Sequence, residues 1–406
     1  MVPKGWSHTT FEKHIDCLTG YAFSSTEYSA EEHDIRLLRG DNIEPGKLRW
    51  INAKRWPRNV QENMDKYFLL EGDFVIALDR TWISGGLKVA EVTCDDLPCL
   101  LVQRVARIRA KKTLAQGLLR QYFSGYKFER YVKFTQTATA VPHISPNDIK
   151  QFSLLLPPIA EQKKIAQILS TWDKAISVTE KLLANSQQQK KALMQQLLTG
   201  KKRLLDENGV RFSGEWCTCT LSEVAHIIMG SSPKSEAYND NGLGLPLIQG
   251  NADIKCRVSC PRVYTSDITK ECTPGDILLS VRAPVGTVAL SQHKACIGRG
   301  ISAIKSKRKM SQSFLYQWFL WFEPKWCYLS QGSTFESINS DDIKTLKLSV
   351  PNFEEQQKIA AVLSAADVEI STLEKKLACL KDEKKALMQQ LLTGKRRVKV
   401  DEAVAA

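Results

Sequence analysis

The twelve-residue segment KKALMQQLLTGK occurs twice in this 406-residue chain, letter for letter, at residues 190–201 and 384–395. The two copies are separated by 384 − 190 = 194 residues. Upstream residues also match at this offset, from Pro157 with Pro351 to Asp173 with Asp367. A repeat of this length predicts two copies of one structural element, so any fold proposed for the chain has to accommodate it twice.

Apolar residues recur at alternating steps of four and three through the second copy, and the first copy follows the same steps with a more polar middle. This heptad pattern, broken at Lys384, predicts a long helix with a coiled-coil seam. Proline before and glycine after each copy fit a helix start and stop. The predicted seam consists of Ile165, Leu169, Trp172, Ile176, Leu183, Leu193 and Leu197, and of Ile359, Leu363, Ile370, Leu373, Leu377, Leu380, Leu387 and Leu391.

The two predicted helices need a partner because burial of the seam supplies most of the stability of such a helix. They can pair with each other in one chain, and their similar sequences suit a pseudo-twofold arrangement. Pairing between two copies of the chain is the alternative. The tether within one chain gives a high effective concentration, which favours the intramolecular pair.

Two globular segments remain, and both have short apolar runs separated by turn residues, as in mixed α/β domains. FVIAL (74–78) and ILLSV (277–281) each follow a Gly-Asp pair, and RLLRGDNI (36–43) corresponds to PLIQGNADI (246–254). The predicted fold class is α+β, with an internal repeat. The predicted division is a first domain at 1–150, a helical region at 151–203, a second domain at 204–345, a helical region at 346–396 and a tail at 397–406.

The composition is that of a globular protein with a basic surplus, a formal net charge of +13. A basic surplus favours a polyanionic partner such as nucleic acid, although charge alone does not identify one. No apolar run approaches ~18 residues and the first residues do not resemble a signal peptide, so a cytoplasmic protein is expected. The eleven scattered cysteines lack zinc-ligand spacing, and no metal site is predicted.

Sequence signatures of catalysis are absent. The chain has no D/N-P-P-Y/F tetrad of the kind that holds a target base in a methyltransferase, no phosphate loop and no HExxH pair. Adjacent acidic residues such as Asp341-Asp342 give no positioned acid and base. We therefore expect no catalytic residue and no cofactor in this chain.

PPIAEQKKIAQIL followed by KKALMQQLLTGK resembles the helical region of specificity subunits of type I restriction–modification systems. GSSPKSEAYNDNGLGLPLIQGNADI and PGDILLSVRAPVGTVAL resemble their target recognition domains, and the resemblance covers essentially the whole chain. It implies two target recognition domains held apart by an antiparallel coiled coil. Each domain would read one half of a split double-stranded DNA site.

The resemblance also implies partners: two modification (methyltransferase) subunits docked on the helices, and restriction subunits in a larger complex. S-adenosylmethionine, ATP and magnesium are then expected on those partner subunits, which would methylate adenine and cleave DNA in phage defence. A coiled-coil protein–protein scaffold with two globular binding domains and no DNA recognition is the alternative interpretation.

In the first domain, basic and aromatic residues lie together within twelve positions, and further polar residues lie near strand ends or before the helical region. A solvated basic loop with packed tryptophans would give the same pattern. The candidate DNA-binding residues are Lys47, Arg49, Trp50, Lys54, Arg55, Arg58, Arg80, Arg104, Gln136, Thr137 and Thr139.

In the second domain, the candidates surround the PLI run, end the ILLSV strand or form a polar loop before Asp342. Turn chemistry alone could account for several of them. They are Ser231, Ser232, Lys234, Tyr238, Asn239, Gln249, Asn251, Arg282, Arg299, Gln331, Ser333 and Thr334.

Overall fold

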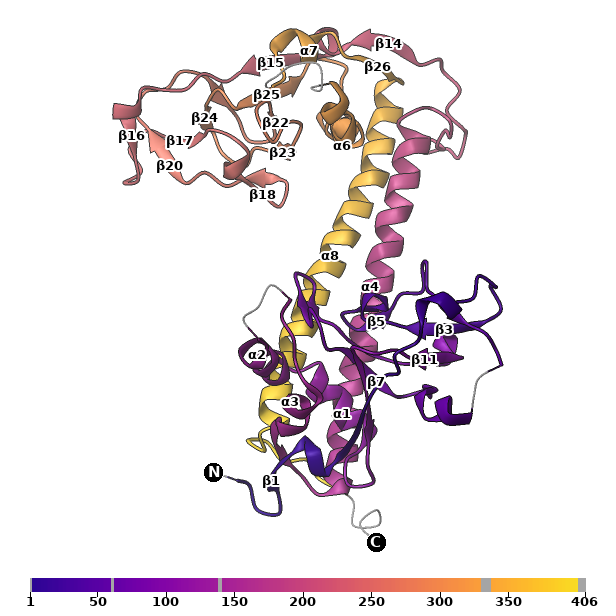
Figure 1. The fold of residues 1–406 in the computed structure, drawn as a ribbon. Coiled ribbons are helices and arrows are strands. Elements are labelled where there is room, and N and C mark those ends of the chain that lie inside the picture. The colour runs from indigo at the N-terminus through magenta and orange to yellow at the C-terminus, as the bar shows by residue number, and fades with distance from the viewer. Residues whose placement is uncertain (1, 60–61, 138–140, 330–336, 401–406) are drawn as a thin grey trace. The chain divides into compact units, whose positions relative to one another are not determined.

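The computed structural model describes residues 2–59, 62–137, 141–329 and 337–400. The chain divides into two compact units (Figure 1). Unit 1 comprises Met1–Thr179 and Lys376–Ala406, and unit 2 comprises Glu180–Lys375. Both changes of unit fall within a long helix, so each of the two long helices contributes one half to each unit.

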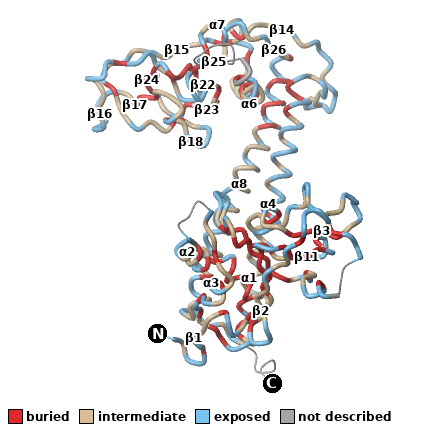
Figure 2. The backbone as a smooth tube through the Cα atoms, viewed as in Figure 1, coloured by how far each residue is buried: buried red, intermediate tan, exposed pale blue. Residues whose placement is uncertain are grey.

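The long helices α4 (Ile159–Leu197) and α8 (Phe353–Leu391) contain 39 residues each. Every predicted seam position on them is buried or half-buried, whereas most residues between these positions are exposed (Figure 2). In unit 1, Ile165 and Leu169 share a core with Leu391, and in unit 2, Leu197 shares a core with Ile359. The start of each helix therefore packs on the end of the other within one chain. The predicted antiparallel pair is confirmed.

Unit 1 holds a four-stranded sheet in the order β10-β7-β12-β2, a three-stranded sheet β11-β3-β6 and three two-stranded pairs, β1-β13, β4-β5 and β8-β9. Their bounds are β1 Ser7–Thr10, β2 Ile15–Thr19, β3 Ile35–Leu38, β4 Ile43–Glu44, β5 Lys47–Leu48, β6 Arg55–Trp56, β7 Phe74–Ala77, β8 Trp82–Ile83, β9 Gly86–Leu87, β10 Val89–Glu91, β11 Cys99–Leu101, β12 Val105–Ala110 and β13 Ser153–Leu156. The helices of this unit, besides its halves of α4 and α8, are α1 Gln116–Phe123, α2 Tyr126–Thr135 and α3 Pro146–Gln151, with short 3₁₀ turns η1 Phe11–Lys13, η2 Ser25–Glu27, η3 Gly40–Asn42, η4 Glu62–Tyr67 and η5 Cys94–Asp96.

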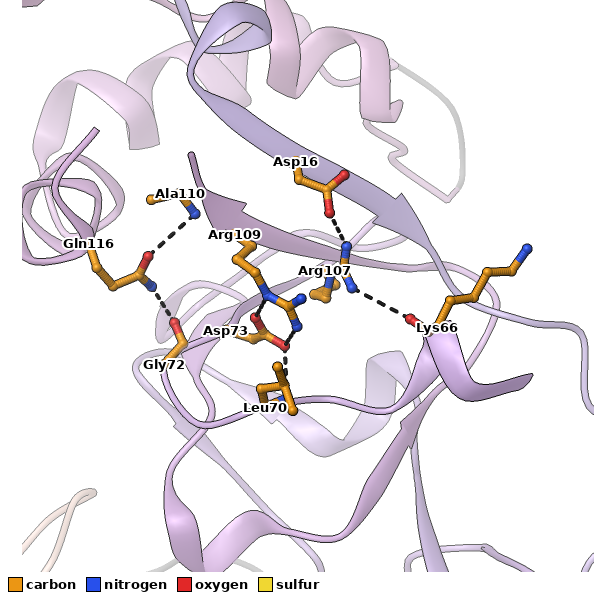
Figure 3. Close-up of polar contacts among 9 residues, drawn as sticks. All are labelled: Asp16, Lys66, Leu70, Gly72, Asp73, Arg107, Arg109, Ala110 and Gln116. Atoms are coloured by element: carbon orange, nitrogen blue, oxygen red, sulfur yellow. Dashed lines mark hydrogen bonds and ion pairs between the residues drawn. The ribbon is translucent and has the colours of Figure 1, made fainter. Parts of the chain in front are cut away.

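Two ion pairs tie the strands of the four-stranded sheet to each other and to the preceding loop (Figure 3). Asp73, only 2% exposed, accepts from Arg109 Nε at 2.6 Å and from the Leu70 amide at 2.8 Å. Arg107 on β12 pairs with Asp16 on β2. Because both carboxylates receive charged donors across neighbouring strands, these ion pairs support the register of the sheet on the side where β7 begins and β12 ends.

Unit 2 holds a six-stranded sheet β15-β25-β22-β23-β19-β18, a five-stranded sheet β16-β20-β17-β24-β21 and the pair β14-β26. The bounds are β14 Cys217–Thr220, β15 Ala225–Met229, β16 Tyr238–Asn239, β17 Leu245–Ile248, β18 Ile254–Lys255, β19 Val258–Ser259, β20 Val263–Thr265, β21 Glu271–Cys272, β22 Ile277–Ser280, β23 Val288–Leu290, β24 Ala295–Ile297, β25 Ile301–Ser306 and β26 Lys347–Val350. Its other helices are α5 Leu221–Val224, α6 Gln312–Leu329 and α7 Ser340–Lys344, with 3₁₀ turns η6 Ser235–Ala237 and η7 Asn251–Asp253.

The two units repeat one topology. The order β2-β12-β7-β10 returns as β15-β25-β22-β23, and the parallel pair β3-β11 returns as β17-β24. A glycine follows β2 and β15 because the chain passes close to another backbone there. A Cβ at Gly20 or at Gly230 would lie 2.2 Å from the carbonyl oxygen of Val102 or Gly298, respectively. The internal repeat therefore extends from the helices into both globular parts.

Equivalent glutamines join each long helix to its own globular part. Gln162 Oε1 accepts from the Ala115 amide at 2.8 Å, and Gln356 Oε1 accepts from the Ser311 amide at 2.9 Å. Each of these amides lies at the start of a helix, α1 or α6. Among the described helices, none combines the length and apolar composition needed to span a membrane.

Candidate nucleic-acid interface

A pocket of about 410 Å³ lies in unit 1 where several strands end. Two predicted residues, Arg80 after β7 and Arg104 before β12, meet in it. Residues that the sequence analysis did not select also line it, namely Tyr28, Arg39, Lys88 and Gln103. With four basic and two acidic side chains, this basic pocket carries a net positive charge suited to phosphate or to the acceptor edge of guanine.

Arg104 is held in place by an acid in the pocket. Its guanidinium donates to Asp79 at 2.7 Å, and the other oxygen of Asp79 lies 2.7 Å from His143 Nδ1. Burial alone would raise the pKa of Asp79, but the hydrogen bonds from His143 and Arg104 lower it below its ordinary value. The carboxylate is thus ionised at neutral pH and orients Arg104.

The backbone at both arginines adopts the left-handed conformation, with φ of 46° at Arg80 and 66° at Arg104. Residues with a Cβ rarely occupy this region, and such strain concentrates at functional sites. The side chains are therefore presented from tight turns at the ends of adjacent strands.

Lys88 supplies a buried positive charge to the basic pocket. It is 9% exposed, and burial lowers the pKa of its ammonium group, with Asp41 opposing this shift. A buried lysine has few waters to lose when an anion arrives. This position therefore favours an anionic ligand group over a neutral one.

A second pocket of about 220 Å³ adjoins the first and shares Arg39 and Asp41 with it. The predicted residues Arg49 and Lys54 line it. Lys47 lies nearby and forms an exposed ion pair with Glu44 at 3.2 Å, and Glu44 also contacts Arg49 at 3.3 Å. The two pockets form one basic surface, and its basic residues come from five separate stretches of sequence, at Arg39, Arg49 to Lys54, Arg80, Lys88 and Arg104.

Three other predicted residues of unit 1 have partners within the fold. The Trp50 indole donates to Asp96 at 2.7 Å, and the Arg36 guanidinium lies 4.7 Å from its ring centroid. Arg55 and Arg58 donate to the backbone oxygens of Asp34 and His33. These contacts stabilise the loop around β6.

The polar stretch after α2 lies beside the same strands. Gln136 ends α2 with its side-chain oxygen buried, and the Thr137 hydroxyl accepts from the His143 amide at 3.0 Å. Since His143 also contacts Asp79, this stretch supports the basic pocket from one side. Thr139 lies outside the described residues.

In unit 2, the equivalent surface has a different chemistry. Ser231 and Ser232 lie beside the exposed Arg299, whose amide donates to the Ser232 hydroxyl at 3.4 Å. Gln249 follows β17, and its backbone N–H donates to Asp253 Oδ2 at 2.9 Å. Asn251 begins η7 directly after it. Serine, amide and arginine side chains therefore take the place of the basic cluster.

The remaining predicted residues of unit 2 are mixed. Asn239 closes a loop through two hydrogen bonds to the Leu243 backbone, and the Tyr238 hydroxyl donates to the Pro233 oxygen at 3.3 Å. Lys234 is exposed beside Asp267, which accepts from its amide. Arg282 is exposed and lies two residues after the end of β22. Gln331, Ser333 and Thr334 lie outside the described residues.

The described side chains form no cluster of histidine, cysteine and carboxylate that could hold a metal ion, and the cysteines described are free thiols. The arrangement that the structure does provide is a pair of polar and basic surfaces at strand ends, one in each unit. Such surfaces can bind phosphates and base edges.

Comparison with known proteins identifies a family. The sequence profile described as "Type I restriction modification DNA specificity domain" matches residues 35–185 and 213–381. The putative type I restriction enzyme MjaX specificity subunit of Methanocaldococcus jannaschii is 34% identical over 378 residues, covering 90% of this chain and 87% of that protein. The EcoAI specificity subunit of Escherichia coli is 34% identical over 182 residues, covering 45% of this chain and 30% of that protein.

Solved structures agree with this match. A chain from a structure concerned with complex assembly and conformational transition of the type I R-M system is 26% identical, with a TM-score of 0.57, and covers 97% of this chain and 99% of its own length. The S subunit of a type I restriction–modification system from M. genitalium has a TM-score of 0.65 at 14% identity, covering 96% of each chain, and supports the fold alone.

Proposed function

Because this chain belongs to the family of type I restriction–modification DNA specificity subunits, we propose that each of its units reads one half of a bipartite DNA site. The basic pocket of unit 1 would read or grip one half-site. The serine, amide and arginine surface of unit 2 would read the other. The observation that carries the proposal is the convergence, in each unit, of polar side chains at equivalent strand ends.

The family membership agrees with the absence of catalytic motifs from the sequence, and the chain is a specificity subunit rather than an enzyme. Catalysis would then belong to partners, namely two modification subunits docked on α4 and α8 and restriction subunits in a larger assembly. S-adenosylmethionine, ATP and magnesium would bind to those partners, and the complex would act on DNA in the cytoplasm. Family membership does not favour the alternative of a scaffold without DNA recognition.

The candidate residues divide by role in this proposal. Arg39, Arg80, Lys88 and Arg104 contact DNA in unit 1, with Arg49 and Lys54 on the flanking phosphates. Arginine that is bidentate to guanine specifies sequence, whereas lysine on phosphate positions the protein. In unit 2, Gln249 and Asn251 suit adenine, and Arg282 and Arg299 suit guanine or phosphate. The first recognition domain would end at residue 150 and the second at residue 345.

Co-expression with the neighbouring methyltransferase, followed by mapping of methylated positions across the host genome, tests the function. The expected result is a split motif with two specified parts and a constant unread gap. Methylation at an uninterrupted motif, or sequence-independent methylation, would contradict the proposal. The matched control is the methyltransferase expressed alone.

A further inference from the structure

Two lysines occupy seam positions on the long helices, where a coiled coil ordinarily places apolar residues. Lys190 on α4 and Lys384 on α8 are equivalent under the offset of 194 residues. The side chain of each is only 11% exposed. Both lysine side chains are therefore largely shielded from water within the seam of the helix pair.

Each lysine meets an aspartate of the other helix. In unit 1, Lys384 Nζ lies 2.6 Å from Asp173, and in unit 2, Lys190 forms an ion pair with Asp367. The two aspartates are again equivalent, since 367 − 173 = 194. The same cross-helix pair has thus been built twice, once in each unit.

A third helix joins each pair. Gln121 on α1 donates to Asp173 at 2.7 Å, and Gln317 on α6 donates to Asp367 at 2.8 Å. Both glutamines are buried, at 0% and 1% exposure. We call these clusters the unit 1 junction (Lys384, Asp173, Gln121) and the unit 2 junction (Lys190, Asp367, Gln317).

The polar residues of the two junctions are not expected to raise the stability of the helix pair. The side-chain oxygen of Gln121 and that of Gln317 are buried with no hydrogen-bond partner among the described residues. A buried acceptor left in this way costs free energy, and replacing a buried ion pair by apolar groups often raises stability. A polar group kept at a seam is best attested as a means of selecting register and pairing.

The internal repeat would allow α4 and α8 to pair in more than one alignment. Since α4 and α8 have similar seams, a parallel alignment of equivalent residues would also bury apolar side chains, but it would place Lys190 against Lys384. A heptad slip of the antiparallel pair would separate each lysine from its aspartate. It would place Lys190 and Lys384 level with Ala360 and Ala166 in one direction, and level with Glu374 and Glu180 in the other. Of these alignments, the observed register alone brings both lysines to the aspartates that Gln121 and Gln317 also hold.

We infer that the two junctions are positioning devices that select the antiparallel register of α4 and α8 and fasten α1 and α6 to it. The register then sets the gap between the half-sites, a consequence that rests on the proposed function. A slip of one heptad moves one helix along the other by ~10.5 Å, or ~3 base pairs at ~3.4 Å each.

The test replaces both lysines by leucine (Lys190→Leu with Lys384→Leu) and maps methylation in the full complex. The variant is expected to fold, because the aspartates that lose their lysine partners are 37% and 40% exposed, and to methylate sites of more than one gap length, including gaps that differ by ~3 base pairs. A single wild-type gap in this variant would overturn the inference.

The matched control reverses both pairs (Lys190→Asp with Asp367→Lys, and Lys384→Asp with Asp173→Lys). Each glutamine can turn its free oxygen toward the new lysine, so the wild-type gap should return. If the leucine variant fails to fold, this control decides: a wild-type gap supports selection by charge pairing, and an altered gap refutes it.

A second readout does not depend on DNA. The observed register in unit 2 brings the seam residues Leu183 and Leu373 to the same level of the helix pair. A disulfide cross-link between cysteines placed at these two positions should form in the otherwise wild-type chain and in the charge-reversed control, and be depleted in the leucine variant. If the wild-type complex methylates no split motif but the cross-link follows this pattern, the proposed function fails and the register inference stands. An undiminished cross-link in the leucine variant refutes the register inference.

Discussion

The helical frame of this protein, formed by α4 and α8 with the residues that join them, differs from the two polar surfaces in how similar its two copies are. In the frame, Glu161, Asp173 and Lys384 of unit 1 have the same residue types at the same offset in unit 2, with the same kinds of contact. On the surfaces, equivalent positions carry different chemistry. The chain has retained one way of holding its domains while changing what each domain presents.

Backbone hydrogen bonds establish which surface positions are equivalent. The Leu78 amide donates to the Arg104 oxygen, and the Val281 amide donates to the Gly300 oxygen. Arg104 therefore corresponds to a glycine, the acid Asp79 corresponds to Arg282, and Gln103 corresponds to Arg299. The charge pattern is exchanged along the same strand ends. Two surfaces built in this way are expected to recognise different half-sites.

Exchange of one domain has the largest expected effect, and it tests whether the two domains recognise their half-sites independently. Replacing residues 1–150 by the equivalent domain of a relative should change one half-site completely and leave the other half and the gap unchanged, because the frame is retained. Methylation mapping measures all three. If both half-sites changed, the units would not read independently. The reciprocal exchange of 204–345 is the control.

Lengthening the frame should alter spacing without altering sequence. Seven residues inserted after residue 180 of α4 and seven after residue 375 of α8 keep both junctions paired and add ~10.5 Å to the helix pair. We expect the gap to change by ~3 base pairs, with both half-sites intact.

The same map measures the gap, and the insertion in one helix alone serves as the comparison. It should abolish specific methylation because the helices no longer match in length. An unchanged gap in the double insertion would show that the helix pair does not set the spacing.

The equivalent arginines Arg203 and Arg397 should differ in how much their removal lowers the free energy of unfolding. Glu355 is fully buried and accepts from Arg203 Nε at 2.6 Å, whereas Glu161 accepts from both Arg397 and the Trp6 indole. Arg203→Met leaves Glu355 without its cationic partner and should cost about 3–5 kcal/mol in the free energy of unfolding.

Arg397→Met should cost less, because the Trp6 indole still donates to Glu161 and the arginine is 42% exposed. Denaturant unfolding of the two variants checks the order. Adding Glu355→Gln to Arg203→Met should recover part of the loss, since it removes the buried charge. Equal losses in the two arginine variants would contradict the account.

The smallest expected effect concerns acid. The lowered pKa of Asp79 means that its contacts with Arg104 and His143 contribute stability above its ordinary value of 3.8. That contribution is lost as the pH falls through the lower folded-state pKa. Asp79→Asn should therefore reduce the loss of stability that occurs as the pH falls below 3.8. Arg282→Gln, at the equivalent position of unit 2, should leave this pH dependence unchanged.

The frame could be predicted because its information is periodic and local. Heptad spacing placed the seam, and the repeat placed it twice. The lysines at 190 and 384 were visible as breaks in the pattern. Their partners Asp367 and Asp173 lie 177 and 211 residues away along the chain, since 367 − 190 = 177 and 384 − 173 = 211. Sequence spacing alone does not pair them.

The surfaces were predicted only in part, for the same physical reason. Arg80 and Arg104 were found because they flank strong strand patterns. Arg39 and Lys88 were missed because they come from other strand ends and meet the first two only in the folded sheet. Trp50 was selected for its basic neighbours, yet its indole donates to Asp96, an interaction that no local pattern predicts.

The most direct test of two dissimilar surfaces on one repeated frame is the methylation map of a unit 1 surface variant, Arg80→Ala with Arg104→Ala. We expect relaxed sequence preference in one half-site alone, by about 1–3 kcal/mol of discrimination for each arginine–base interaction removed, with the other half and the gap unchanged. Arg282→Ala with Arg299→Ala should do the same to the opposite half. Relaxation of both halves by either variant, or a change of gap, would contradict the account.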